Sequence, residues 1–172
     1  HDKDGFVGTM EMNAVGTFNV SRLAAAAMGA NEPDDEGERG VIVIDPLISA
    51  ETAAAALGLY RAHRGDRPVT AVIYTHSHVD HFAGVRGVVD QADVDSGNVP
   101  IIAPVGFTQH AVSENVYAGT AMARRAGYMY GAALDRSPVG QVGAGLGQTN
   151  STGTVTLIPP TIEITMTGQE LT

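Results

Sequence analysis

The stretch Val69-Thr-Ala-Val-Ile-Tyr74 runs directly into Thr75-His-Ser-His-Val-Asp-His81, and this junction decides the fold. The first half is a run of mostly apolar and β-branched residues, which is typical of a strand buried inside a sheet. The second half crowds imidazole and carboxylate side chains into the turn that must follow such a strand. We therefore expect a polar loop that can carry chemistry at the carboxyl end of a buried strand.

That loop holds four candidate metal ligands within six residues, namely His76, His78, Asp80 and His81. The chain has no cysteine, so a transition-metal site must use imidazoles and carboxylates, which are ligands that Zn²⁺ accepts. We expect His76 and His78 to share one ion, and Asp80 and His81 to share a second ion nearby. Two adjacent metals can activate water at neutral pH. The competing interpretation is a solvated, histidine-rich loop that binds nothing.

Upstream of this loop, the apolar run Val41–Ile44 predicts a strand that delivers Asp45 to its carboxyl end. A carboxylate at that position can accept a hydrogen bond from a metal-bound histidine and orient it, and a helix cap or turn explains Asp45 equally well. Ser49 is the expected N-cap of a helix whose residues 53–64 are stopped by Gly65. The order strand, helix, strand predicts parallel pairing and an α/β fold.

Downstream of the histidines, the remaining elements follow from periodicity and turn signals. We expect a helix around residues 82–90, a polar loop over 92–98, a third strand at 101–103, a long helical segment over 106–130, and a hairpin of strands 154–158 and 161–166 around Pro159-Pro160. The three apolar strands should be neighbours in one sheet.

The composition narrows the classes of function. A chain of 172 residues with 44% apolar residues fits one domain, and a formal charge of −9 without a basic cluster argues against a nucleic-acid partner. No apolar run approaches the roughly 20 residues of a membrane-spanning helix. We therefore expect a soluble protein without a membrane span, either cytoplasmic or exported with its signal missing. Residues 1–39 are expected to form an atypical, partly disordered segment.

Three further features receive structural explanations. His63 near a helix end and His110 inside a helix are expected to be structural rather than metal ligands. The glycine-rich residues 140–147 follow no strand and lack the spacing of a phosphate-binding loop, so we expect a flexible loop. The tyrosines and methionines between Tyr117 and Tyr130 are expected to pack in the core or against another domain.

The motif His76-x-His78-x-Asp80-His81 resembles that of the metallo-β-lactamase superfamily, and further stretches are similar to its linear alkyl sulfatase branch. The stretches that carry this likeness are residues 41–47, 75–81, 110–115, 124–125, 128–131 and 142–147. The resemblance covers about residues 40–170. It implies a metallo-β-lactamase-like αββα sandwich of the α/β (α+β) class, incomplete in this chain, with residues 40–172 forming a partial domain.

The resemblance also implies a function. The branch hydrolyses sulfate esters, such as linear primary alkyl sulfates, to an alcohol and sulfate through a hydroxide that bridges two zinc ions. By resemblance, His76 and His78 hold the first Zn²⁺, Asp80 and His81 hold the second, and Asp80 is the catalytic residue, while Asp45 supports a ligand. The partner is then a small anionic sulfate ester, and full-length members form homodimers.

In this branch the remaining ligands are glutamates and a further histidine, which lie beyond the segment matched here, as do a dimerisation region and a lipid-carrier-like domain. We therefore expect the first part of a catalytic domain, whose half-built metal site is weakly active or inactive alone. Two alternatives stay open. One is another hydrolase of the superfamily, such as a thioesterase, lactonase or phosphodiesterase, and the other is a truncated fragment without catalysis.

Overall fold

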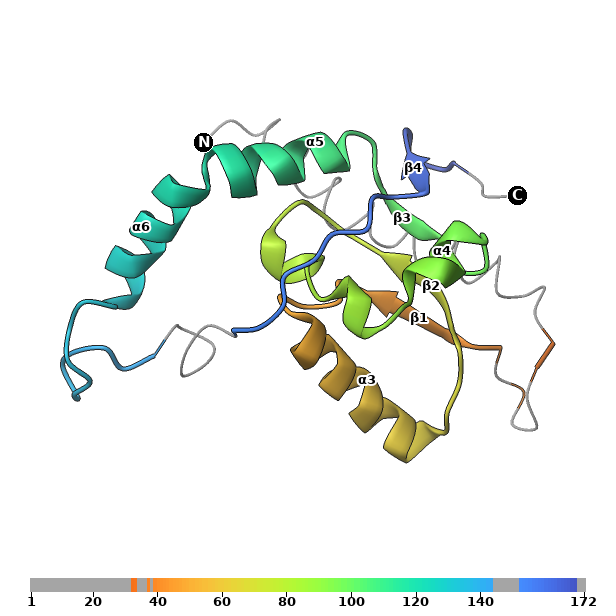
Figure 1. The fold of residues 1–172 in the computed structure, drawn as a ribbon, viewed down its shortest axis with the longest axis horizontal. Coiled ribbons are helices and arrows are strands. Elements are labelled where there is room, and N and C mark those ends of the chain that lie inside the picture. Colours follow the sequence, from red (N-terminus) through yellow and green to blue (C-terminus); the bar gives the residue numbers. More distant parts are fainter. Residues whose placement is uncertain (1–31, 34–36, 38, 144–151, 170–172) are drawn as a thin grey trace.

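A four-stranded sheet forms the centre of the computed structural model, which describes residues 32–33, 37, 39–143 and 152–169 (Figure 1). All pairings are parallel, and the spatial order is β1 (Val41–Ile44), β2 (Val69–Ile73), β3 (Ile101–Pro104) and β4 (Ile162–Ile164). The predicted first three strands and their parallel neighbourhood are confirmed. Most of the predicted segment 1–39 lies outside the described residues.

The side chains of β2 alternate between two apolar clusters, as the period of a strand requires. Val72 and Tyr74 join a large cluster with Leu57, Phe82 and Phe107, whereas Ala71 and Ile73 join a smaller cluster on the opposite face. Val72, Ile73 and Tyr74 are each fully buried. The end of β2 is therefore anchored on both faces, and the histidine loop leaves from a rigid point.

Helix α3 (Ala50–Arg64) connects β1 to β2, and its predicted caps are confirmed. The buried Ser49 accepts a hydrogen bond from the backbone N–H of Thr52 at 3.3 Å, which satisfies one of the free donors at the helix start. The helix ends at Gly65, whose positive φ of 87° is more accessible to glycine than to other residues. In Figure 1, α3 lies below β1, and its Leu57 packs in the same apolar cluster as Val72 of β2.

The segment after the histidines is irregular where a helix over residues 82–90 is predicted, so that prediction is wrong. Within residues 82–90 the regular structure is one short 3₁₀ turn, Val85–Gly87, and another 3₁₀ turn, Val79–His81, precedes it inside the histidine loop. The N–H of Gly84 donates to the carbonyl of Leu47 at 2.9 Å, which draws the segment against the loop before α3. The predicted polar loop over 92–98 is also wrong in part, because α4 (Gln91–Asp95) forms there.

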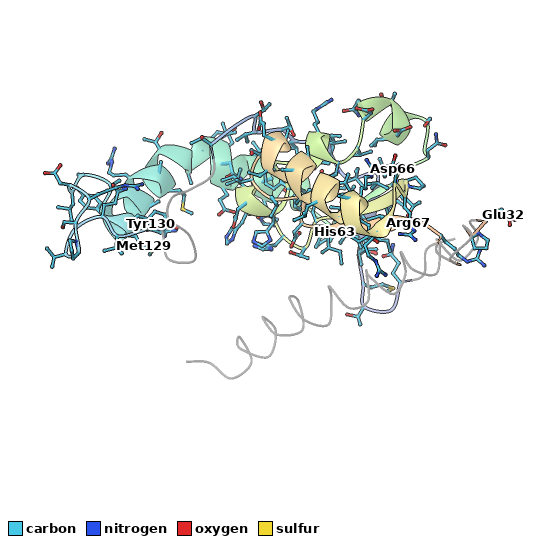
Figure 2. The ribbon with its side chains drawn as sticks, turned by 90° about the horizontal axis from the view of Figure 1, so that it is seen from below. Glu32, His63, Asp66, Arg67, Met129 and Tyr130 are labelled. Atoms are coloured by element: carbon cyan, nitrogen blue, oxygen red, sulfur yellow. The ribbon has the colours of Figure 1, made fainter. Side chains whose placement is uncertain are left out.

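The predicted helical segment over 106–130 is present but is built from three pieces. These are α5 (Phe107–Val112), a π-helical turn (Ser113–Tyr117) and α6 (Gly119–Tyr130). No residue of α6 is buried, and in Figures 1 and 2 α6 leads away from the sheet, with Met129 and Tyr130 at its far end. Core packing of the tyrosines and methionines between Tyr117 and Tyr130 is therefore not found, and their packing against another domain stays a prediction. No described helix is both long and apolar enough to cross a membrane.

The predicted hairpin of 154–158 and 161–166 is wrong. Only Ile162–Ile164 forms a strand, and it pairs in parallel with β3. Residues before Pro159 use their backbone groups elsewhere, because Thr156 N–H donates to the Ala83 carbonyl at 2.8 Å and the Thr154 carbonyl accepts from Ala50 N–H at 3.0 Å. Residues 154–158, the crossing segment, thus connect the start of α3 to the residues that follow the histidine loop.

Glu51 clamps the crossing segment, and this contact predicts a dependence of stability on pH. Its carboxylate accepts from the hydroxyl of Thr154 at 2.6 Å and from its N–H at 2.8 Å, and these bonds lower the pKa of Glu51 from 4.5 to about 2. A depressed carboxyl pKa stabilises the folded state above pH 4.5, and this contribution is lost as the pH falls towards 2. We expect the urea midpoint of the chain to fall more steeply over this range than that of Glu51→Gln. A parallel pH profile for both would contradict the clamp, and Glu163→Gln, an exposed carboxylate on β4, is the control.

Candidate metal centre

The histidine loop lies at the carboxyl ends of β1 and β2, where the predicted ligand side chains converge. His76 and His81 are partly buried, and His78 and Asp80 are exposed. The ring centroid of His76 lies 4.0 Å from that of His81 and 4.6 Å from that of His78. The loop is therefore folded back on itself, as a chelating loop must be.

Two close approaches join the residues that the sequence pairs, while their roles as ligands stay a prediction. His76 Nε2 lies 3.1 Å from His78 Nδ1, and His81 Nε2 lies 3.4 Å from Asp80 Oδ2. Two ligand atoms bound to one tetrahedral zinc at its usual bond lengths lie about 3.3 Å apart. Both separations therefore fit a pair of atoms that face a common ion, and the donor set is one that zinc accepts.

Asp45 supports this loop from the end of β1. Its Oδ1 accepts from the Thr75 N–H at 2.8 Å, and its Oδ2 accepts from the Thr75 hydroxyl at 2.7 Å and from His81 Nδ1 at 2.8 Å. Asp45 holds these contacts with a φ of 53°, and Leu47 has a φ of 63°. A left-handed backbone at two non-glycine residues is strained, and such strain is concentrated at functional sites.

These hydrogen bonds determine which ring nitrogens of two histidines are free. A carboxylate only accepts, so His81 donates from Nδ1 to Asp45 and keeps the lone pair of Nε2. The Thr75 hydroxyl donates its hydrogen bond to Asp45, and it therefore accepts a hydrogen bond from His76 Nδ1 at 2.8 Å. His76 likewise keeps the lone pair of Nε2. One aspartate thus orients two predicted ligands, one directly and the other through a threonine.

The electrostatic environment favours neutral His76. Burial lowers the pKa of His76, and the neighbouring His81 and His78 lower it further, against a smaller opposing influence of Asp45 and Asp80. The neutral imidazole is the form that binds a metal ion. Among the described residues, Asp45, His76 and His81 also offer donor atoms that all lie within 4.8 Å of one another. Because both oxygens of Asp45 already accept hydrogen bonds, we assign it to orientation of ligands, and its role stays a prediction.

Two further histidines and the glycine-rich segment are predicted to lie outside the site, and among the described residues neither histidine belongs to the group of close donor atoms. His63 is exposed in the last turn of α3, and His110 is exposed in α5. In the predicted glycine loop, residues 140–143 have no helix or strand, and 144–147 lie outside the described residues.

Sequence reasoning missed Glu114 as a site residue. Its Oε1 lies 3.2 Å from His78 Nε2, and its Oε2 accepts from the Ser77 hydroxyl at 3.3 Å. The available signal was topological, because Glu114 follows a strand parallel to β2, and the segments after parallel strands meet at one edge of the sheet.

Comparison with known proteins finds a family model and several relatives that match this chain. The Metallo-beta-lactamase superfamily matches residues 36–163. The linear primary-alkylsulfatase of Pseudomonas sp. is 66% identical over 134 residues, which are 78% of this chain and 20% of that protein. The solved stereoselective inverting sec-alkylsulfatase Pisa1 from Pseudomonas sp. superposes with a TM-score of 0.66 at 51% identity, over 74% of this chain and 20% of its own. The chain thus spans about a fifth of the length of these relatives.

A shorter match is of a different kind. The 3-hydroxyacyl-CoA dehydrogenase type-2 of Homo sapiens is 40% identical over 65 residues, which are 38% of this chain and 25% of that protein. This likeness covers a minor part of both proteins, whereas the superfamily match includes the whole histidine loop and the end of β1.

Proposed function

Because the chain belongs to the metallo-beta-lactamase superfamily, we propose that it forms part of a zinc-dependent hydrolase that cleaves linear primary alkyl sulfates to an alcohol and sulfate. The observation that carries this proposal is the pairing of donor atoms in the loop after β2, at 3.1 Å and 3.4 Å. The likeness to alkylsulfatases supports the choice of substrate.

In this proposal the loop holds two zinc ions. His76 Nε2 and His78 Nδ1 would bind the first ion, and Asp80 Oδ2 and His81 Nε2 would bind the second, so that Asp80 belongs to the catalytic centre. When bound, the ions supply a water of lowered pKa and positive charge for the sulfate head group. Asp45 and Thr75 keep His81 and His76 in the tautomers that leave their Nε2 atoms free.

Each ion would receive two ligands from the described loop. Catalytic zinc sites commonly have three protein ligands, so we expect these two pairs to bind zinc more weakly than a complete site does. We accordingly propose that the 172-residue chain alone binds zinc weakly and releases little sulfate, and that the remainder of an alkylsulfatase supplies the missing ligands.

Metal removal tests the function. The matching segment of the Pseudomonas sp. linear primary-alkylsulfatase is replaced by the residues of this chain, and sulfate release from dodecyl sulfate is measured. We expect activity in this hybrid, a loss of at least about 100-fold after chelation, and recovery when Zn²⁺ is added, because metals supply several kcal/mol of stabilisation to such reactions. The unmodified alkylsulfatase, treated identically, is the control.

Two results would contradict the proposal. A folded hybrid that contains zinc and releases no sulfate would contradict sulfate ester hydrolysis as the reaction. Full activity in a hybrid shown to be free of metal would contradict the requirement for a metal. A panel of a thioester, a lactone and a phosphodiester tests the substrate class, because the histidine loop by itself does not select the substrate. If the hybrid hydrolyses any of these three compounds faster than dodecyl sulfate, that compound class becomes the proposed substrate in place of the sulfate ester.

A further inference from the structure

The π-helical turn Ser113–Tyr117 directs two consecutive side chains towards the histidine loop. A π-helical turn is a rare widening of a helix that is found preferentially at functional sites. Here Glu114 contacts the side chains of Ser77 and His78, while Asn115 Nδ2 donates to the Ser77 carbonyl at 3.4 Å and to the Ala111 carbonyl at 2.9 Å. The turn thus holds the loop at residues that Asp45 does not reach.

His78 faces Glu114 with one ring nitrogen and His76 with the other. Its Nε2 lies 3.2 Å from Glu114 Oε1, and its Nδ1 lies 3.1 Å from His76 Nε2. Because a carboxylate only accepts, the proton of neutral His78 belongs on Nε2, and the lone pair of Nδ1 points towards His76 Nε2. His78 therefore presents the opposite ring nitrogen from His76 and His81, whose free atoms are both Nε2.

We infer that Glu114 is a positioning residue that holds His78 in the Nε2–H tautomer, so that its Nδ1 binds the first metal. The inference deepens the proposed function, because it rests on the same loop binding a metal. The Glu114 side chain is 24% exposed whereas that of His78 is 57% exposed, so the carboxylate is the better-held partner. A contact between side chains this exposed contributes little to stability, so orientation of the ring is the effect to measure.

The test uses the 172-residue chain and two readouts other than catalysis. Binding of Co²⁺, a spectroscopic substitute for zinc, is titrated by visible absorption, and the tautomer of His78 is read from ¹⁵N chemical shifts of the metal-free chain at alkaline pH. Loss of a group that orients a ligand histidine typically costs about 10–100-fold in metal affinity. We expect a loss in this range for Glu114→Ala, and a smaller loss for Glu114→Gln, whose amide oxygen still accepts from Nε2. In both variants without metal, the proton of His78 should shift in part from Nε2 to Nδ1, and this shift should be larger in Glu114→Ala.

Glu163→Ala is the matched control, because it removes an exposed carboxylate on β4. Circular dichroism and urea unfolding establish that each variant is folded. The inference is overturned if Glu114→Ala binds Co²⁺ within twofold of the parent chain, or if His78 of the parent carries its proton on Nδ1. It is also overturned if Glu114→Gln loses as much affinity as Glu114→Ala and the Co²⁺ spectrum reports one ligand fewer, because Glu114 would then bind the metal itself.

The proposed function can fail separately. In one case, the hybrid binds Co²⁺ normally, responds to Glu114→Ala as expected and still releases no sulfate. That result would contradict the proposed substrate and support the positioning role of Glu114. In the opposite case, sulfate release by the hybrid falls in His76→Ala, and Glu114→Ala changes neither sulfate release nor Co²⁺ affinity. That result would contradict the positioning role and support the proposed function.

Discussion

Replacing His76 by alanine should lower sulfate release from dodecyl sulfate by at least about 10³-fold in the alkylsulfatase hybrid, because loss of a metal removes several kcal/mol of transition-state stabilisation. His76 Nε2 lies 3.1 Å from His78 Nδ1, so its removal leaves the first proposed ion with a single ligand from the loop. The His76 ring also lies against that of His81, at 4.0 Å between centroids. The second site should therefore weaken as well.

Zinc content and sulfate release are measured on the same purified samples. We expect the variant to retain fewer than the two equivalents of zinc proposed for the parent hybrid. His63→Ala is the matched control, because it removes the same side chain from an exposed position in the last turn of α3 (Figure 2). Activity of His76→Ala within tenfold of the parent would show that this imidazole does not hold a catalytic metal.

The parts of the structure that sequence reasoning predicts correctly are those encoded locally. The apolar runs of β1, β2 and β3 mark strands whichever partner they pair with, and Ser49 and Gly65 mark the ends of α3 through their own capping chemistry. The loop after β2 is also local, since its four candidate ligands lie within six residues. The pairing of their donor atoms follows from the turn at the end of a buried strand.

The errors concern segments whose structure is decided by distant contacts. Residues 154–158 alternate like a strand, but the backbone groups of Thr154 and Thr156 bond to Ala50 and Ala83, about 70 to 100 residues earlier. Residues 82–90 have helical composition, yet Gly84 and Gly87 pack against backbone near the start of α3, and the chain forms a tight 3₁₀ turn at Val85–Gly87. Periodicity describes one element at a time and contains no information on such partners.

The candidate site divides along the same line. The sequence leaves Asp45 open between support of a ligand histidine and a helix cap or turn, and the structure places its Oδ2 2.8 Å from His81 Nδ1. Glu114 was missed, because its position depends on the π-helical turn that widens the helix before it reaches His78. A motif indicates the residues that could bind a metal, whereas Asp45 and Glu114, whose carboxylates contact His81 and His78, come from elsewhere in the chain.

Gly84→Ala should destabilise the chain by about 3 kcal/mol, the upper part of the range for overpacked sites, and lower its melting temperature by roughly 6–12 °C. A Cβ at Gly84 would overlap the Pro46 carbonyl oxygen and lie 2.6 Å from the Ser49 carbonyl oxygen and 2.9 Å from Ala53 Cβ. Backbone atoms cannot rotate away as a flexible side chain can. The two segments must therefore separate, and the hydrogen bond from Gly84 N–H to the Leu47 carbonyl would lengthen.

Gly58→Ala is the control with the opposite expected sign. Gly58 is exposed in the middle of α3, and a Cβ there would meet nothing within 4 Å. The substitution should stabilise the chain by about 0.5–1 kcal/mol, because alanine favours a helix over glycine. Urea and thermal unfolding give both free energies. Gly84→Ala should also weaken Co²⁺ binding, since separation of these segments moves His81 away from Asp45. Equal, small effects of the two substitutions on stability would show that the loop after β2 is not locked against the start of α3.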